Sequence, residues 1–158
     1  MKESNSSKYA LSLFSSAGIG ELGVKACGID ILLSNELLKE RCMLYHENYP
    51  NTESICGDIW TLQNKIIEEW RNKNVGNPFL VYATPPCQGM SFNSIGRIQY
   101  EIRMGKRPKE DPRNRLIIPT LEITKELQPQ WILLENVPDM HRNLVVHFQG
   151  CSCRKNDI

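Results

Sequence analysis

One cysteine stands in a setting that suits nucleophilic chemistry. Cys87 follows two prolines in the segment ATPPCQ, directly after the apolar run 79–83. A thiol at the carboxyl end of a strand becomes a reactive thiolate when helix-terminal N–H groups or a cation lie nearby. Glu135 ends the later apolar run WILLE, where burial would raise its pKa and let it serve as an acid. A cysteine taken alone is more often a buried apolar residue, but the rigid approach through two prolines favours a nucleophile.

A turn with glycines and two acidic residues suggest a second site, one that binds a nucleoside. The first apolar run leads into FSSAGIGE, where Gly18 and Gly20 let a ligand approach the backbone at the start of a helix. Glu36 closes the second apolar run about 20 residues later, where an acid commonly binds ribose hydroxyls. Asp58 follows the third run and can accept a hydrogen bond from an adenine amino group.

Two other interpretations of this turn stay open. The glycines can simply make a tight turn while both acids cap helices, although the three features together favour a nucleoside. A nicotinamide cofactor is the weaker prediction, because the turn begins with Ser-Ala and the G-x-G-x-x-G spacing is incomplete.

Short apolar runs alternate with amphipathic stretches along the chain, which predicts an α/β fold with a parallel sheet. Right-handed crossovers would place the functional loops at the carboxyl ends of the strands. If strands four and five are neighbours, Cys87 and Glu135 then lie side by side. The expected strands are Tyr9–Phe14, Asp30–Asn35, Thr52–Cys56, Phe79–Ala83 and Trp131–Glu135. The expected helices are Gly20–Cys27, Leu37–Asn48, Trp60–Asn72 and Pro112–Leu127.

Two of these helices carry further signals. In the last one, Asp111 and Pro112 form a typical helix start, and Pro119 predicts a kink or a late start. The third helix has apolar and long side chains at a spacing of 3.6 residues, which predicts one buried face. That face would consist of Trp60, Gln63, Ile66, Ile67 and Trp70.

Composition limits the class of protein. The chain has 158 residues, of which 41% are hydrophobic and 23% charged, as in an ordinary globular domain. The sequence has no apolar run long enough for a membrane helix and no signal-peptide pattern, so we expect no membrane partner and a cytoplasmic location. The six cysteines are scattered, which predicts reduced thiols and no metal site.

Positive charge is concentrated between Arg97 and Arg115, with seven bases against three acids. Such a stretch can contact phosphates, or it can be a solvated surface loop. Charge alone favours the solvated loop, because the excess is small.

Taken in order, the segments FSSAGIGE, NE, GDI, PPCQGMS, DPRNRL and ENVP resemble motifs of the cytosine-5 DNA methyltransferases, most of all the bacterial restriction-modification enzymes. The resemblance covers roughly Leu11 to Met140. It implies a Rossmann-like methyltransferase fold, here only its parallel-strand half, and S-adenosyl-L-methionine as cofactor. By this resemblance the cofactor-binding residues are Phe14, Gly18, Ile19, Gly20, Glu36, Asp58, Ile59 and Leu116.

The same resemblance implies roles in catalysis. Cys87 would attack C6 of a cytosine flipped out of duplex DNA, and Glu135 would bind N3 and the exocyclic amine. Pro86 would shape the turn that holds the nucleophile, and Asn136 would orient the loop after strand five. The mobile loop of the family lies after the nucleophile, which raises the expectation that its polar residues meet DNA. These DNA-binding candidates are Ser91, Arg97 and Arg103.

The sequence past ENVP departs from the family pattern, which continues with an arginine-bearing motif, a recognition domain and a returning C-terminal segment. We therefore expect residues 1–142 to form the cofactor-binding and catalytic part, and 143–158 an unmatched, poorly ordered tail. Activity would then require double-stranded DNA and a second chain that carries the missing parts. The alternatives are an inactive truncated remnant and a tRNA cytosine-5 methyltransferase, since one branch with these motifs acts on RNA.

Overall fold

The computed structural model describes residues 7–86, 100–101, 103–106 and 112–136. This part of the chain contains one parallel sheet with the strand order β3-β2-β1-β4-β5. The strands are β1 (Lys8–Leu13), β2 (Ile29–Glu36), β3 (Glu53–Cys56), β4 (Leu80–Ala83) and β5 (Trp131–Leu134). The helices are α1 (Glu21–Ala26), α2 (Lys39–Asn48), α3 (Ile59–Asn72) and α5 (Ile117–Leu127), with a 3₁₀ turn, η2, at Pro112–Leu116.

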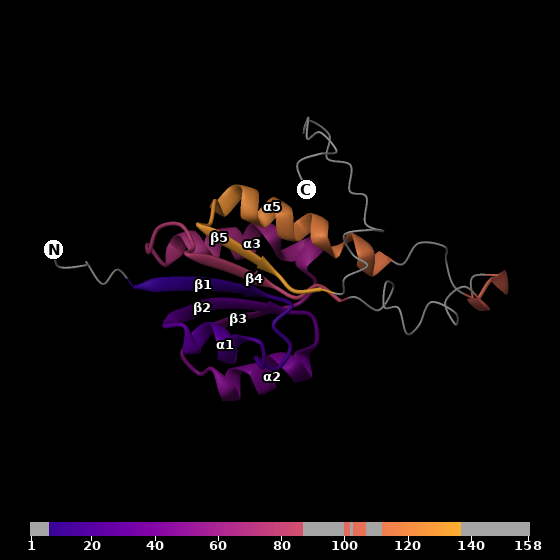
Figure 1. The fold of residues 1–158 in the computed structure, drawn as a ribbon, viewed down its shortest axis with the longest axis horizontal. Helices are drawn as coiled ribbons and strands as arrows, with labels where there is room; N and C mark the ends of the chain where they lie inside the picture. The colour runs from indigo at the N-terminus through magenta and orange to yellow at the C-terminus, as the bar shows by residue number, and fades with distance from the viewer. Residues whose placement is uncertain (1–6, 87–99, 102, 107–111, 137–158) are drawn as a thin grey trace.

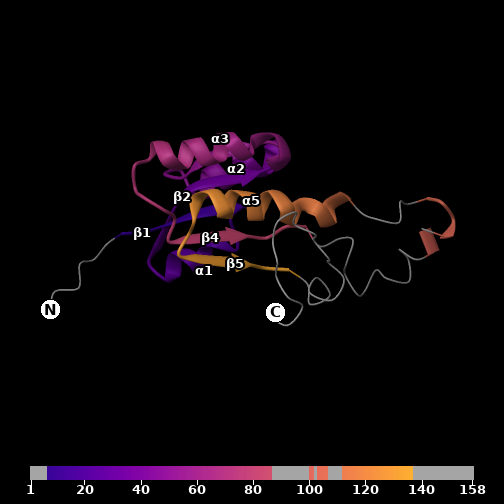
Figure 2. The same ribbon diagram turned by 90° about the horizontal axis from the view of Figure 1, so that it is seen from above.

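The sheet lies between two layers of helices, as the two ribbon views show (Figures 1 and 2). Helices α3 and α5 cover one face, and α1 and α2 cover the other. This arrangement buries the central strands on both sides, so their side chains are apolar in long runs. Leu11, Leu33 and Val81 come from three adjacent strands and pack in one core with Ile66 and Trp70 of α3. The predicted α/β class, the parallel sheet and the position of β4 beside β5 are confirmed.

The buried face of α3 differs from the prediction at its start. Ile59 is only 3% exposed, whereas Trp60 is 41% exposed. Successive residues of a helix are about 100° apart, so with Ile59, Ile66 and Trp70 at the centre of the buried face, Trp60 lies at its margin. The prediction for Trp60 was therefore wrong, because Ile59 lies on the buried face in its place.

Pro119 is accommodated by a late start of its helix. Residues Pro112–Leu116 form the 3₁₀ turn η2, and the α-helix begins only at Ile117. Pro119 then lies in the first turn of α5, where a missing N–H breaks no helical hydrogen bond. The expected late start is confirmed, whereas Asp111 lies outside the described residues.

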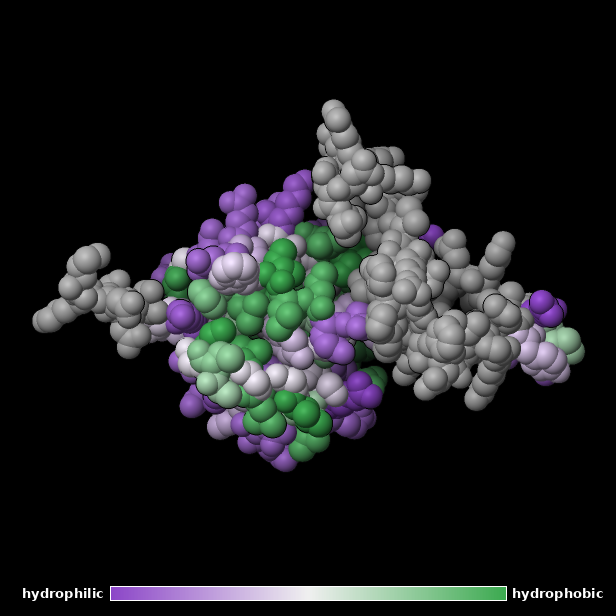
Figure 3. Space-filling view, in the orientation of Figure 1, coloured by the Kyte–Doolittle hydropathy of each residue, from purple (hydrophilic) through white to green (hydrophobic). Residues whose placement is uncertain are grey.

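Strand β5 differs from the expected buried strand. Its exposed fractions run from 60% at Trp131 to 37% at Leu134, and Glu135 is also exposed. Successive strand residues point to opposite faces, so both faces of β5 are uncovered by the described part of the chain. Figure 3 shows apolar surface where β5 lies in Figure 1. The prediction of a buried strand end at Glu135 was wrong, because β5 is an edge strand and the described helices leave both of its faces exposed.

No helix of the described residues is both long enough and apolar enough to span a membrane.

Candidate active site

A crevice opens at the carboxyl ends of β1, β2 and β3 and reaches the end of β4. It encloses about 470 Å³. This is the edge of a doubly wound sheet at which ligands generally bind, because the loops there leave the sheet in opposite directions. The crevice is lined by Phe14, Glu36, Asp58, Ile59 and Leu116, all expected at a cofactor, together with Pro86, which precedes Cys87.

Glu36 is held rigidly at the rim of this crevice. Its side chain is buried, and Oε2 accepts a hydrogen bond from the backbone N–H of Ser16 at 2.9 Å. Oε1 accepts from the backbone N–H of Leu38 at 3.0 Å. An ionised carboxylate has about four acceptor positions, so the two backbone bonds leave room for two ribose hydroxyls. The structure thus fixes the Glu36 carboxylate at the crevice through two backbone hydrogen bonds.

Asp58 caps helix α3 and also lines the crevice. It is the N-cap of α3, and its Oδ1 accepts the backbone N–H of Trp60 at 3.0 Å. The capping interpretation left open by the sequence is therefore correct for one oxygen of Asp58. Because the cap fixes the side chain at the helix start, the carboxylate lies beside Ile59 at the crevice wall.

The glycine turn is only partly joined to this crevice. Phe14 and Ser16 line it, but Gly18 and Ile19 line a neighbouring cavity of about 370 Å³. Gly20 is the N-cap of α1 and lies against the hydroxyl of Tyr82. The structure therefore groups five of the expected cofactor residues and leaves Gly18, Ile19 and Gly20 to one side.

Two side chains at the end of α2 hold the glycine turn in place, and sequence reasoning missed both. Asn48 Nδ2 donates to the carbonyl of Ala17 at 2.9 Å, and the Tyr49 hydroxyl donates to that of Gly18 at 2.6 Å. The turn also bends through left-handed backbone at two non-glycine residues, Phe14 and Ser16. Such conformations cost roughly 1–3 kcal/mol each and cluster at binding sites, which fits a turn built for a ligand.

Gly18 is the position of the turn least able to carry a side chain. Its φ is +86°, and an added Cβ would overlap the ring of Tyr49. We expect Gly18→Ala to lower the free energy of unfolding by roughly 1–3 kcal/mol. Gly23→Ala is the matched control, because Gly23 lies within α1 with open space around it, and it should stabilise by up to about 1 kcal/mol. Urea denaturation of both variants measures the difference, and equal stabilities would contradict the assigned geometry.

The last residue of the motif FSSAGIGE forms a buried polar contact beneath the turn. Glu21 is 1% exposed, and Ser12 Oγ donates to its Oε1 at 2.5 Å. Burial raises the pKa of Glu21, and the bond from Ser12 offsets only part of that rise. The pKa of Tyr82 is also raised, mainly by burial and then by the nearby Glu21. Burial thus disfavours the charged form of Glu21, and no local sequence pattern predicts this buried contact.

The Pro85-Pro86 turn after β4 and the residues after β5 are joined by backbone and side-chain hydrogen bonds. Glu135 N–H donates to the carbonyl of Ala83 at 3.0 Å, which extends the β4–β5 pairing by one residue. Asn136 Nδ2 donates to the carbonyl of Pro85 at 3.0 Å. The residue expected to orient the loop after strand five therefore binds the Pro85-Pro86 turn itself. This places Glu135 beside the turn that leads to Cys87.

Most of the remaining expected site residues lie outside the described part of the chain. Cys87, Ser91 and Arg97 lie outside the described residues, and so do all residues after Asn136. Arg103 is described and exposed. Within the described ranges, no group of three or more His, Cys, Asp or Glu side chains is arranged to hold a metal ion.

The sequence matches known DNA methyltransferases over most of its length. The family model of the C-5 cytosine-specific DNA methylases matches residues 9–146. The type II methyltransferase M1.HgaI of Avibacterium volantium is 43% identical over 130 residues, which are 81% of this chain and 34% of that protein. The type II methyltransferase M.AquIA of a Picosynechococcus strain is 34% identical over 84% of this chain and 50% of its own length.

The fold is also similar to that of solved structures. An E. coli prophage-encoded protein, described as a DNA modification methyltransferase, superposes with a TM-score of 0.67 and 27% identity. The match covers 87% of this chain and 34% of that one, so the expected Rossmann-like methyltransferase fold is confirmed. The chain spans between about a third and a half of the length of these three proteins. On the strength of the family match over residues 9–146, the chain belongs to the C-5 cytosine-specific DNA methylases.

Proposed function

We propose that this chain carries the cofactor-binding and catalytic half of a DNA (cytosine-5-)-methyltransferase of the restriction-modification type. It would transfer a methyl group from S-adenosyl-L-methionine to C5 of cytosine through a covalent adduct at Cys87. The observation that carries this proposal is the shared crevice: Glu36 and Asp58 line it from β2 and the start of α3, and Pro86 lines it from the turn before Cys87.

The crevice suits the adenosine part of the cofactor. Glu36 offers a rigid carboxylate for the ribose, and Phe14, Ile59 and Leu116 supply apolar surface for the purine. Asp58 lies at the same wall, and its carboxylate can accept the hydrogen bond that an exocyclic amino group donates. When bound, S-adenosylmethionine supplies a methyl group on a sulfonium centre, which a carbon nucleophile can accept.

The protein's part is to make cytosine C5 nucleophilic. The thiolate of Cys87 would add to C6 of the ring, and Glu135 would offset the charge that develops at N3. After methylation, loss of the C5 proton and of the thiol would restore the aromatic ring. Because β4 and β5 are paired up to Glu135, the cysteine turn and the acid start from neighbouring strands. The hydrogen bond from Asn136 to Pro85 would hold the two loops in register.

The exposed strand β5 supports the proposal that this half works with the remaining part of a methyltransferase. Trp131 to Leu134 are all apolar and exposed, and a parallel strand of this kind is normally covered on both faces. A further strand and helices, on this polypeptide or a second one, would bury them. Ser91, Arg97 and Arg103 would then contact phosphates of a duplex whose target base is flipped.

The substrate is tested by tritium transfer from labelled S-adenosylmethionine. The chain carries a tag and is expressed from its native locus, so that any polypeptide that supplies the remaining part is produced with it. We expect label in 5-methylcytosine of duplex DNA and none in tRNA. Label in tRNA alone would support the RNA branch and refute the DNA assignment. Cofactor binding without transfer to either nucleic acid would identify an inactive remnant, and it too would refute the proposed activity.

A further inference from the structure

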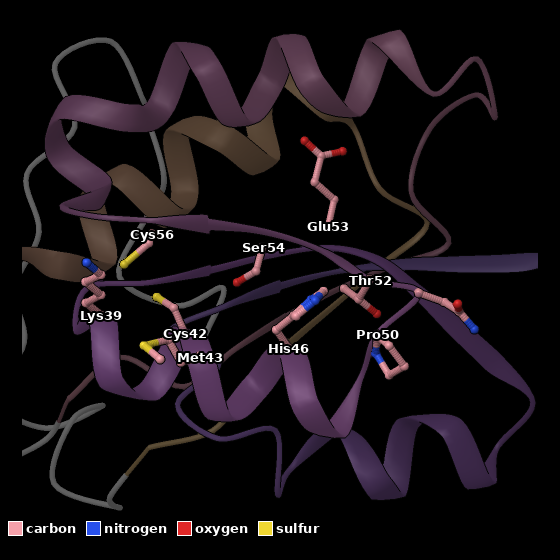
Figure 4. Close-up of a pocket in the computed structure, with 10 residues that line it drawn as sticks. Lys39, Cys42, Met43, His46, Pro50, Thr52, Glu53, Ser54 and Cys56 are labelled. Carbon is pink, nitrogen blue, oxygen red and sulfur yellow. The ribbon is translucent and has the colours of Figure 1, made fainter.

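A second cavity, of about 590 Å³, lies between α2 and β3 at the opposite edge of the sheet from β5 (Figure 4). Its wall carries three sulfur-containing side chains, Cys42 and Met43 of α2 and Cys56 of β3. No role in the proposed methyl transfer uses any of them. The two thiols point into the same space between helix and strand, as the close-up shows.

Backbone geometry brings the two thiols together. Cys42 Sγ donates to the carbonyl of Glu36 at 3.4 Å, and Cys56 Sγ donates to that of Leu37 at 3.9 Å. Cys56 is also the direct partner of Glu36 across the β2–β3 pairing. Neighbouring strands lie about 4.8 Å apart, so the Cys42 thiol sits at the carbonyl of the residue that pairs with Cys56. The two sulfur atoms thus lie at the carbonyls of two successive residues, Glu36 and Leu37.

We propose that Cys42 and Cys56 form an oxidisable dithiol site, at which a peroxide converts the two thiols to a disulfide that links α2 to β3. Both cysteines are free in the structure, with Cys56 exposed and Cys42 buried. The inference stands apart from the proposed methyl transfer, because it uses only the geometry of the α2–β3 cavity.

The reaction balances with hydrogen peroxide as the oxidant. The Cys56 thiolate attacks one peroxide oxygen, the O–O bond breaks, and a sulfenic acid and hydroxide form. The Cys42 sulfur then attacks the Cys56 sulfur, the S–O bond breaks, and the proton of Cys42 leaves with the hydroxide as water. Overall two thiols are oxidised by two electrons, and one peroxide is reduced to two waters.

The surroundings assign different roles to the two cysteines. Burial raises the pKa of Cys42 to about 12, and the neighbouring Cys56 and Glu36 side chains add to that rise. Cys42 therefore remains a thiol until a partner sulfur is activated beside it. Cys56 is the exposed one, so a peroxide in solvent reaches it first. Cys56 would be the attacking cysteine and Cys42 the resolving one.

Trypsin provides a direct test, because cleavage after Arg41 and Lys65 releases one peptide with Cys42, Cys56 and no other cysteine. After peroxide treatment of the full chain, we expect this peptide to lose the mass of two hydrogens and both alkylatable thiols. Dithiothreitol should restore them. Exposed Cys27 is the internal reference for oxidation. If Cys27 is oxidised while the peptide keeps both thiols, or if Cys56 is found linked to another cysteine, the proposal is refuted.

Two single variants separate the roles. In Cys42→Ser, which can still donate to the Glu36 carbonyl, the sulfenic acid of Cys56 should persist and be captured by dimedone. In Cys56→Ser, Cys42 should stay reduced under the same treatment. Dimedone capture at Cys42 in the second variant would overturn the assigned order. Far-UV circular dichroism of each variant confirms that the comparison is made on folded protein.

Discussion

Replacement of Cys87 by serine is expected to abolish covalent trapping on duplex DNA that contains 5-fluorocytosine, and to lower methyl transfer by on the order of 10³-fold or more. The fluorine at C5 cannot leave as a proton does, so the wild-type adduct should survive a denaturing gel. A serine hydroxyl ionises far less readily than a thiol and has no designated base in the described site, so it should not add to C6. The assay uses the tagged chain expressed from its native locus, as in the tritium-transfer experiment.

The control for this prediction is Cys27→Ser, which removes an exposed cysteine at the end of α1. It should leave trapping and transfer unchanged. Cys87→Ser should also bind S-adenosylmethionine as tightly as the wild type, because the crevice contacts come from other residues. An adduct that persists in Cys87→Ser would show that another group is the nucleophile.

Replacement of Glu36 by glutamine is expected to weaken S-adenosylmethionine binding by roughly 10- to 100-fold. Hydrogen bonds from hydroxyls to a charged acceptor contribute about 1.5–3 kcal/mol, and the amide of glutamine offers one neutral oxygen in place of two charged ones. The substitution also affects the bonds from Ser16 and Leu38, so its effect on folding must be separated from its effect on the ligand.

A ligand without ribose hydroxyls makes that separation. If Glu36 binds the ribose, the variant should lose affinity for S-adenosylmethionine but show little further loss for the 2′,3′-dideoxy analogue. A purely structural defect would weaken both ligands by the same factor and would contradict the assigned contact. Asp30→Asn, at an exposed position near the other end of β2, is the matched control and should bind both ligands as the wild type does.

The sheet and its crevice were predictable because they rest on local patterns. Apolar runs of strand length, separated by amphipathic stretches, predicted the parallel order that puts Glu36 and Asp58 at one edge. The position of Pro119 predicted a late helix start, because proline is tolerated only in the first helical turn.

Features that depend on contacts between distant segments were not predictable in this way. The bonds from Asn48 and Tyr49 to the glycine turn span 31 residues, and neither residue type at a helix end suggests them. The buried carboxyl of Glu21 needed knowledge of which side of α1 faces the sheet. The exposure of β5 was not predicted, because an apolar strand is expected to be buried and its own sequence does not show which segment covers it.

The central claim, that the crevice at the ends of β1, β2 and β3 holds a methyl-donor nucleoside, is tested most directly by titration calorimetry of the wild-type chain. S-adenosylhomocysteine and NADH are compared as ligands under the same conditions. The account predicts one site for S-adenosylhomocysteine per chain, absent for NADH and weakened in Glu36→Gln. Binding of NADH in preference, or S-adenosylhomocysteine binding that Glu36→Gln leaves unchanged, would contradict it.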